Sequence, residues 1–177
     1  FIERLDSLSQ KHYLAGFFSY EFGYLLEDKF QIQKSSSFPY ALFGVYNKPI
    51  IYDHHKQQFI SKGDLSFLEQ SADYEISQLR LNISKRDYIK NIDKIRHYIK
   101  QGDIYQANYT VKYNFDFQGS PIALYQDLKK KQNVAYNVLA KFGHDYILSL
   151  SPELFFYKNN QDITVKPMKG TFKRGRN

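Results

Sequence analysis

Residues 151–171 read SPELFFYKNNQDITVKPMKGT, and this stretch decides how the end of the chain folds. An apolar run follows Glu153, a polar turn covers residues 158–162, and apolar residues then alternate with polar ones. Two such segments joined by a polar turn predict a β-hairpin. We therefore expect the hairpin to return Lys169 to the neighbourhood of Glu153.

This arrangement makes Glu153 and Lys169 a candidate catalytic pair. A carboxylic acid and an amine that are held together can serve as general acid and nucleophile. The competing interpretation is an inert surface ion pair, which spacing alone favours because such pairs are common and contribute little to stability. The residues by themselves leave both interpretations open.

Composition limits the classes of protein to consider. The chain has 177 residues, 42% of them hydrophobic, which suits one folded domain or half of a larger one. Cysteine is absent, so neither disulfides nor thiolate metal sites are expected. No apolar run approaches the roughly 20 residues that cross a membrane, and no signal-peptide pattern is present. We therefore expect a cytoplasmic protein without membrane contact.

Two helices are indicated in the middle of the chain. Ser84 and Asp87 resemble a capping box, and Gly102 can supply the C-terminal cap. Between them an apolar stripe recurs at helical spacing, at Tyr88, Ile92, Ile95 and Ile99. Ser120-Pro121 begins a second helix, which runs to the lysine triplet at 129–131.

Between these helices the apolar residues recur at every second position. Apolar and aromatic residues occupy the odd positions from Tyr105 to Phe117, and polar residues occupy the even ones. This alternation predicts one long strand whose odd-numbered face is buried. The even-numbered face, which carries Gln106, either meets solvent or lines a polar cavity that orients a substrate.

Shorter strands are expected on both sides of this region. Their apolar or alternating runs cover residues 13–20, 40–46, 50–52, 58–61, 134–141 and 146–150. The turn chemistry of Asn47-Lys48-Pro49 predicts a hairpin between the second and third of these runs. The last two runs are expected to pair across residues 142–145. Together the elements predict an α+β fold, with a mostly antiparallel sheet and helices laid against one side.

Two segments are harder to assign. Residues 20–27 fit either a strand end or a short helix. His54-His55 invites a metal-site interpretation, but adjacent residues on a strand point apart and no third ligand is near in sequence. A polar turn is the favoured interpretation of the two histidines.

Four motifs occur in order: FSYEFGY at 18–24, GDIYQANYT at 102–110, SPE at 151–153, and PMKGT at 167–171 with Arg174-Gly175. They resemble the motifs of the chorismate-utilising enzymes, which include anthranilate synthase component I, aminodeoxychorismate synthase component I, and the isochorismate and salicylate synthases. The resemblance implies a fold that the family describes as α/β, here α+β, with mostly antiparallel sheets packed as a sandwich and helices outside. It further implies that residues 1–177 form a single domain, the N-terminal portion of a longer enzyme whose C-terminal portion is missing.

The residue at position 169 discriminates between members of that family. Aminodeoxychorismate synthases carry Lys before the Gly-Thr pair, whereas anthranilate and isochorismate synthases carry Ala. The resemblance therefore implies amination of chorismate at C4, in the p-aminobenzoate branch of folate synthesis. In that reaction Lys169 would be the nucleophile that adds to ring C2, and Glu153 would be the general acid for the C4 oxygen.

The resemblance also implies that Gln106, Gly170 and Thr171 contact the substrate. Gln106 stands where relatives that use water place a lysine base, and an amide cannot take a proton at neutral pH. That substitution suits attack by ammonia instead of activated water. Gly170 leaves room for close approach, and Thr171 can offer a hydroxyl and a backbone N–H to a carboxylate.

A cofactor and partners follow from the same resemblance. Chorismate would be the substrate, and ammonia would come from a separate glutamine amidotransferase subunit, because the chain has no Cys for that chemistry. Mg²⁺ is the expected cofactor, with its ligands in the family's continuation beyond Asn177, so we expect no metal ligand within residues 1–177. Residues 1–177 alone are therefore expected to be inactive.

Two other functions stay open. One is an enzyme like anthranilate synthase component I. The other is a domain that binds single-stranded nucleic acid, suggested by a net charge of +7 and 18% aromatic residues. Against it, the aromatic residues occupy the apolar faces of the expected strands and the basic residues follow no single face, so we expect no nucleic-acid partner.

Overall fold

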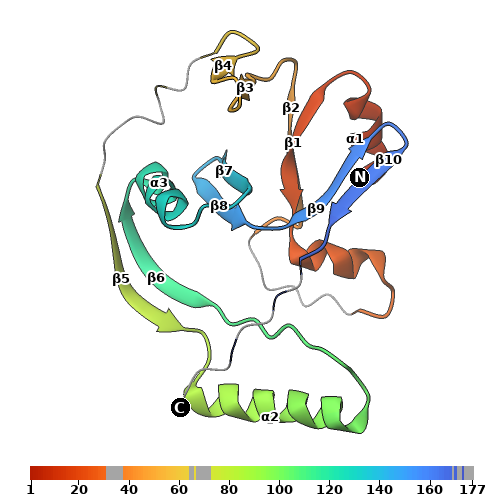
Figure 1. The fold of residues 1–177 in the computed structure, drawn as a ribbon, viewed down its shortest axis with the longest axis vertical. Coiled ribbons are helices and arrows are strands. Elements are labelled where there is room, and N and C mark those ends of the chain that lie inside the picture. Colours follow the sequence, from red (N-terminus) through yellow and green to blue (C-terminus); the bar gives the residue numbers. More distant parts are fainter. Residues whose placement is uncertain (31–37, 64–65, 67–72, 169, 171–172, 174–177) are drawn as a thin grey trace. The chain divides into compact units, whose positions relative to one another are not determined.

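The structure is a computed structural model that describes residues 1–30, 38–63, 66, 73–168, 170 and 173. The chain divides into two compact units, Phe1–Glu69 and Gln70–Asn177, which are described separately below. Figure 1 shows the elements of both units along the chain. The single domain that the sequence suggests stays a prediction.

The first unit is built around one antiparallel pair of strands. Its elements are the helix α1 (Ile2–Ser9), the strand β1 (Tyr13–Phe18), the 3₁₀ helix η1 (Tyr20–Leu26), and the strands β2 (Ala41–Tyr46), β3 (Tyr52–Asp53) and β4 (Gln58–Phe59). β1 pairs with β2 along its whole length, from Tyr13 opposite Tyr46 to Phe18 opposite Ala41. Phenylalanine rings cluster beside this pair, with Phe18 and Phe43 4.9 Å apart between centroids.

The prediction of a hairpin across Asn47-Lys48-Pro49 is wrong. β2 takes β1 as its partner, and the strand after the turn is the two-residue β3, which pairs with β4. Pro49 has no N–H to donate to a ladder, which weakens pairing directly after that turn. The short strand expected at 58–61 is present as β4, and the ambiguous segment 20–27 forms the helix η1.

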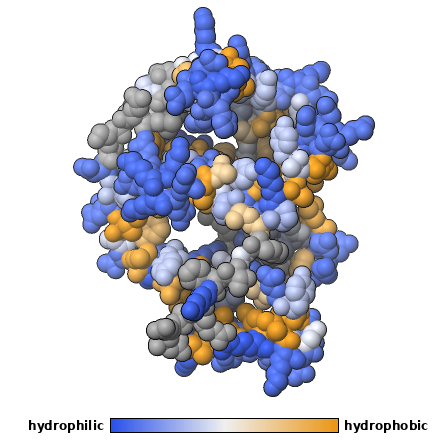
Figure 2. Space-filling view, in the orientation of Figure 1, coloured by the Kyte–Doolittle hydropathy of each residue, from blue (hydrophilic) through white to orange (hydrophobic). Residues whose placement is uncertain are grey.

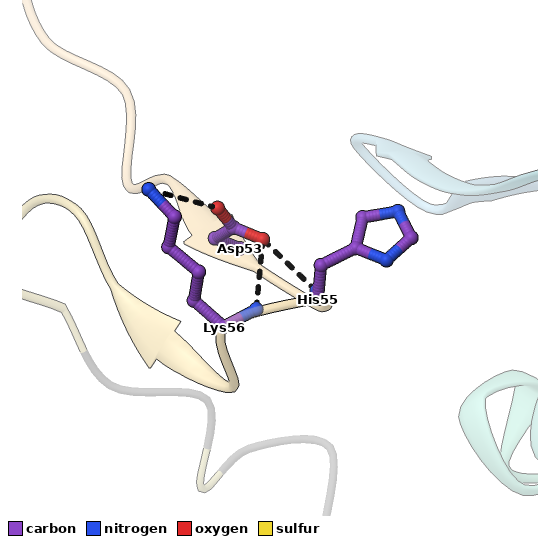
Figure 3. Close-up of polar contacts among 3 residues, drawn as sticks. All are labelled: Asp53, His55 and Lys56. Carbon is purple, nitrogen blue, oxygen red and sulfur yellow. Dashed lines mark hydrogen bonds and ion pairs between the residues drawn. The ribbon is translucent and has the colours of Figure 1, made fainter.

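His54 and His55 lie in the turn between β3 and β4, as the sequence predicts. Asp53 closes this turn: its Oδ1 accepts hydrogen bonds from the backbone N–H of His55 at 2.9 Å and of Lys56 at 3.1 Å. Figure 3 shows these two bonds, with the imidazole of His55 directed away from the carboxylate. The aspartate therefore serves the local backbone, as in other Asx turns.

The described part of the second unit contains three antiparallel strand pairs and two helices. Its elements are β5 (Tyr74–Leu81), α2 (Lys85–Gln101), β6 (Tyr113–Gly119), α3 (Pro121–Lys131), β7 (Tyr136–Phe142), β8 (Asp145–Ser151), β9 (Leu154–Asn159) and β10 (Asp162–Lys166). The pairs are β5 with β6, β7 with β8, and β9 with β10. The expected pairing of the last two strands before Ser151 is confirmed, with Gly143 at φ 63° in the turn between them.

Both helices begin and end where their sequence signals predict. The hydroxyl of Ser84 accepts a hydrogen bond from the backbone N–H of Asp87 at 3.1 Å, and Gly102 ends α2 in the left-handed region at φ 83°. A glycine tolerates that conformation without steric cost. The hydroxyl of Ser120 accepts a hydrogen bond from the backbone N–H of Ala123 at 3.3 Å and so caps α3.

The long strand expected from Tyr105 to Phe117 is wrong in its first half. Regular strand structure begins only at Tyr113, and Tyr105 is 93% exposed. The partner strand β5, which the sequence analysis did not identify, ends at Leu81 opposite Tyr113. An alternating sequence forms a strand only where a neighbouring backbone accepts its hydrogen bonds. Lys112 still accepts a hydrogen bond from the backbone N–H of Asn82 at 2.9 Å, but residues 104–111 form no assigned strand. Tyr109 contacts α2 instead, through a hydrogen bond from Asn91 at 2.7 Å.

The α+β class and the antiparallel character of the sheets are confirmed. None of the described residues is fully buried, and apolar side chains reach the surface on several elements. Figure 2 shows such apolar surface beside polar surface, including at the foot of the view, where Figure 1 draws α2. Within the described part of the chain, no helix is both long and apolar enough to cross a membrane.

Candidate active site around Glu153

The site begins with a tight turn at the end of β8. Ser151 is the last residue of that strand, and Leu154 begins β9, so Pro152 and Glu153 form the connection. The hydroxyl of Ser151 accepts a hydrogen bond from the backbone N–H of Glu153 at 3.2 Å. The same hydroxyl donates to the backbone carbonyl of Glu153 at 3.0 Å. One side chain therefore satisfies both backbone polar groups of the glutamate.

The hairpin predicted after Glu153 is confirmed. β9 and β10 pair antiparallel, and Asn160 in the turn between them has φ 54°, a conformation that asparagine tolerates better than most residues. The pairing ends with Lys166 opposite Leu154. The backbone N–H of Met168 then donates to Oε1 of Glu153 at 3.0 Å. The chain that leaves the hairpin is thus hydrogen-bonded directly to the glutamate carboxylate.

The ladder of this hairpin contains a β-bulge close to Glu153. Thr164 lies opposite Tyr157, but Lys166 lies opposite Leu154, so β9 has one residue more than β10 in this interval. The extra residue belongs to the pair Phe155-Phe156, whose ring centroids are 5.0 Å apart. Because side chains alternate between the faces of a strand, one extra residue reverses the face of every residue before it. The bulge therefore helps to set the side of the hairpin on which Glu153 lies.

A hollow of about 400 Å³ lies beside this carboxylate. Among the described residues, its lining comprises Glu153 and four apolar residues at or beside the hairpin, namely Leu154, Phe155, Val165 and Pro167. A carboxyl group at an apolar wall is an arrangement that binding sites use to orient a mostly apolar ring. The volume falls within the range of small-molecule pockets, which measure about 300–1,000 Å³.

The other predicted site residues have different outcomes. Lys169 and Thr171 lie outside the described residues. Gly170 is exposed, and a Cβ added there would meet nothing within 4 Å. Gln106 is exposed in the segment between α2 and β6, and no hydrogen bond joins it to Glu153 in the part of the chain that the structure describes. The structure thus brings Glu153 together with Met168, the neighbour of Lys169 in sequence.

Sequence analysis gave no role to Ser151 or to the backbone of Met168. A signal for Ser151 was present, since a serine two residues before a strand-edge glutamate can bond that residue's backbone. The Met168 contact had no such signal, because it depends on the register and bulge of the hairpin. Both contacts act on Glu153.

No Mg²⁺ site is assigned among the residues that the structure describes. Across the described ranges, no three His, Asp or Glu side chains gather as a group that could hold a metal ion. Mg²⁺ requires oxygen ligands in near-octahedral geometry, and one carboxylate beside an apolar wall does not provide them. We therefore assign no metal ligand and no metal-dependent step to the residues around Glu153.

Comparison with known proteins gives this geometry a context. The family model described as "chorismate binding enzyme" matches residues 1–177. Anthranilate synthase component 1 of Saccharolobus solfataricus is 28% identical over 144 residues, which are 80% of this chain and 34% of that protein. Aminodeoxychorismate synthase component 1 of Escherichia coli is 26% identical over an aligned length of 172 residues, and the match covers 90% of this chain and 38% of that protein. The chain spans about a third of the length of the curated relatives it matches.

Proposed function

Because the chain belongs to the chorismate-binding enzyme family, we propose that its protein aminates chorismate at C4 to give 4-amino-4-deoxychorismate. This product is the precursor of p-aminobenzoate in folate synthesis. The observation that carries the proposal is the hydrogen bond from Met168 to Glu153, because it ties the PMKGT motif to the glutamate of the SPE motif. Overall identity does not choose between the relatives, since 28% and 26% are similar. Lys169 supports the amination at C4, because this position distinguishes the two activities in the resemblance.

The proposed reaction proceeds in two displacements that balance. The neutral amine of Lys169 forms a bond to ring C2, both ring double bonds shift by one position, and the bond from C4 to its hydroxyl breaks. Glu153 donates a proton to that oxygen, so the leaving group is water instead of the poorly leaving hydroxide. Ammonia then forms a bond to C4, both double bonds shift back, and the lysine amine leaves C2. A proton lost from the new ammonium group restores the acid form of Glu153. The sum is chorismate plus ammonia giving aminodeoxychorismate plus water.

Each named group has one requirement in this scheme. Glu153 must hold a proton when substrate binds, and Lys169 must have lost one. Gln106, Gly170 and Thr171 belong to the proposal as substrate contacts only.

The source of ammonia is the proposed partner. The chain contains no cysteine, the nucleophile that glutamine-hydrolysing enzymes use. We propose that a separate glutamine amidotransferase subunit delivers ammonia, and that ammonium salts replace it in vitro. Mg²⁺ is proposed as the cofactor. Its removal by a chelator, followed by restoration, tests that requirement independently of the residues described above.

The experiment that tests the function incubates the purified protein with chorismate, Mg²⁺ and an ammonium salt. The expected product has the mass of chorismate with one hydroxyl replaced by an amine, and it is not aromatic. Omitting ammonium should abolish its formation. Turnover that requires glutamine in the single purified protein would contradict the proposed partner.

A second candidate is anthranilate formation, the activity for which the relative with 28% identity is named. The same experiment separates the two reactions, because anthranilate is aromatic and fluorescent and its formation releases pyruvate. Appearance of anthranilate as the main product would overturn amination at C4. It would leave membership of the family intact.

A further inference from the structure

We propose that Ser151 is a positioning residue that fixes the catalytic carboxylate of Glu153, an inference that rests on the function proposed above. Ser151 lies at the end of β8, where its side chain is half-buried. It is two residues from Glu153, and its hydroxyl bonds the backbone of Glu153 instead of its carboxylate. Its effect on the reaction therefore passes through Glu153.

The Ser151 hydroxyl makes two hydrogen bonds to the backbone of Glu153. It accepts from the N–H of Glu153 at 3.2 Å and donates to the carbonyl of the same residue at 3.0 Å. Pro152 between them has no N–H, so the N–H of Glu153 is the first backbone donor after Ser151. Bonds to both polar groups of one peptide segment restrict rotation on each side of the glutamate Cα.

The other end of the Glu153 side chain, its carboxylate, is also held by a hydrogen bond. The carboxylate accepts the N–H of Met168 at 3.0 Å. That bond requires a position of the Glu153 Cα from which the side chain can reach Met168, two residues after the end of β10. Ser151 fixes the start of the side chain, and Met168 fixes its end. Removing the hydroxyl frees the backbone of Glu153 and loosens the contact with Met168.

Loss of the Ser151 hydroxyl is expected to lower the reaction rate strongly. A catalytic group must be held close to its productive geometry, and a displacement of about 1 Å can lower the rate by about a hundredfold. Ser151 makes no contact with the hollow beside Glu153, whose lining is formed by other residues. Loss of its hydroxyl should therefore act on kcat more than on KM.

The kinetic test compares three variants of the full-length protein with chorismate and ammonium. Ser151→Ala is expected to lower kcat by about tenfold to a hundredfold and to leave KM within about twofold. Ser151→Thr retains the hydroxyl and should restore most of the activity. Ser149→Ala is the matched control, because Ser149 is also half-buried and lies two residues earlier on the same face of β8. It should behave as the wild type does.

A double variant tests whether Ser151 acts through Glu153. In the Glu153→Gln background the acid is already absent, so adding Ser151→Ala should lower kcat by no more than about twofold. A full and independent loss in that background would overturn the positioning role. So would equal kcat values in Ser151→Ala and the wild type.

Amide hydrogen exchange gives a readout that does not depend on the reaction. The Met168 N–H should exchange several-fold faster in Ser151→Ala than in the wild type or in Ser149→Ala, because its acceptor has become mobile. Unchanged exchange would overturn the inference. A wild type that shows this coupling but does not aminate chorismate would refute the proposed function and leave the positioning of Glu153 supported.

Discussion

At the scale of single residues, the contacts of the second unit connect elements that are distant in sequence. Tyr74 on β5 donates its hydroxyl to Oδ2 of Asp127 on α3 at 3.1 Å. This hydrogen bond raises the pKa of Tyr74 above its ordinary value, with burial and the charge of Asp127 acting in the same direction. Only the protonated phenol can donate to a carboxylate, so the contact between the strand and the helix depends on that proton.

This contact predicts a loss of stability in alkali. The folded state holds the Tyr74 proton more tightly, so its contribution is complete below the unfolded pKa of about 10 and is lost as pH rises through the higher folded pKa. Tyr74→Phe should therefore show a smaller fall in the free energy of unfolding above about pH 10 than the wild type. Denaturant titrations at several pH values measure this difference.

Tyr125 supplies the matched control for that experiment. Burial also raises the pKa of Tyr125, which lies on α3. Tyr125→Phe should retain the part of the fall in the free energy of unfolding above about pH 10 that arises from Tyr74. If Tyr74→Phe followed the pH dependence of the wild type, the hydrogen bond to Asp127 would have no energetic role.

The sequence was sufficient to predict the neighbourhood of Glu153 but not its details. The alternation of residues after the polar turn predicted the hairpin, because strand periodicity is a local property of the chain. The bond from Met168 could not be predicted, since it depends on a bulge that shifts the register by one residue. Gln106 was placed on a strand by the same periodicity, and there the inference failed.

At the scale of elements, sequence signals predicted the helices reliably, because the residues that cap a helix lie close to it in sequence. The helices α2 and α3 carry their caps within a few residues of sequence, and both were predicted. Strands need a distant partner, which periodicity does not identify. Thus β5 was not identified, and the strand expected from Tyr105 is regular only from Tyr113, where β6 begins. For the same reason β2 pairs with β1 and not with the segment that follows it.

The bulge on β9 leads to a prediction about this element. Deleting Phe155 should make the β9–β10 ladder regular and turn Glu153 to the opposite face of the hairpin. We expect turnover of chorismate to fall by at least about a hundredfold, because the acid no longer meets the substrate. Circular dichroism should show that the secondary structure is retained.

Phe155→Val is the control for the deletion, because it keeps the number of residues in the bulge. It should retain the Met168 contact and a substantial part of the activity. Equal activity of the deletion and the wild type would show that the bulge does not orient Glu153.

At the scale of the whole molecule, the apolar surface is the dominant feature. The described residues include no fully buried side chain, and Phe155, Ile163 and Val165 of the hairpin are exposed by 87%, 65% and 59%. The chain also spans only 34% and 38% of the length of two relatives. Large exposed apolar patches mark surfaces that bind a protein, a membrane or a ligand, or that promote aggregation.

This surface predicts how residues 1–177 behave when they are produced alone. They should bind a dye such as ANS that is specific for exposed apolar surface, and they should unfold over a broad denaturant range. Dye binding and the steepness of unfolding measured on the same sample check this expectation. A steep single transition without dye binding would show that the apolar side chains are covered within these residues.

The central claim is that Lys169 attacks the ring while Glu153 releases the C4 oxygen. The most direct measurement is intact-protein mass spectrometry after incubation with chorismate and Mg²⁺ in the absence of ammonia. The account predicts an adduct with the mass of chorismate less one water, which maps to Lys169, is absent from Lys169→Ala, and disappears when ammonium is added. Arginine at this position should form no adduct, because its guanidinium stays protonated. Unchanged turnover in Lys169→Ala, with no adduct on the wild type, would contradict the claim.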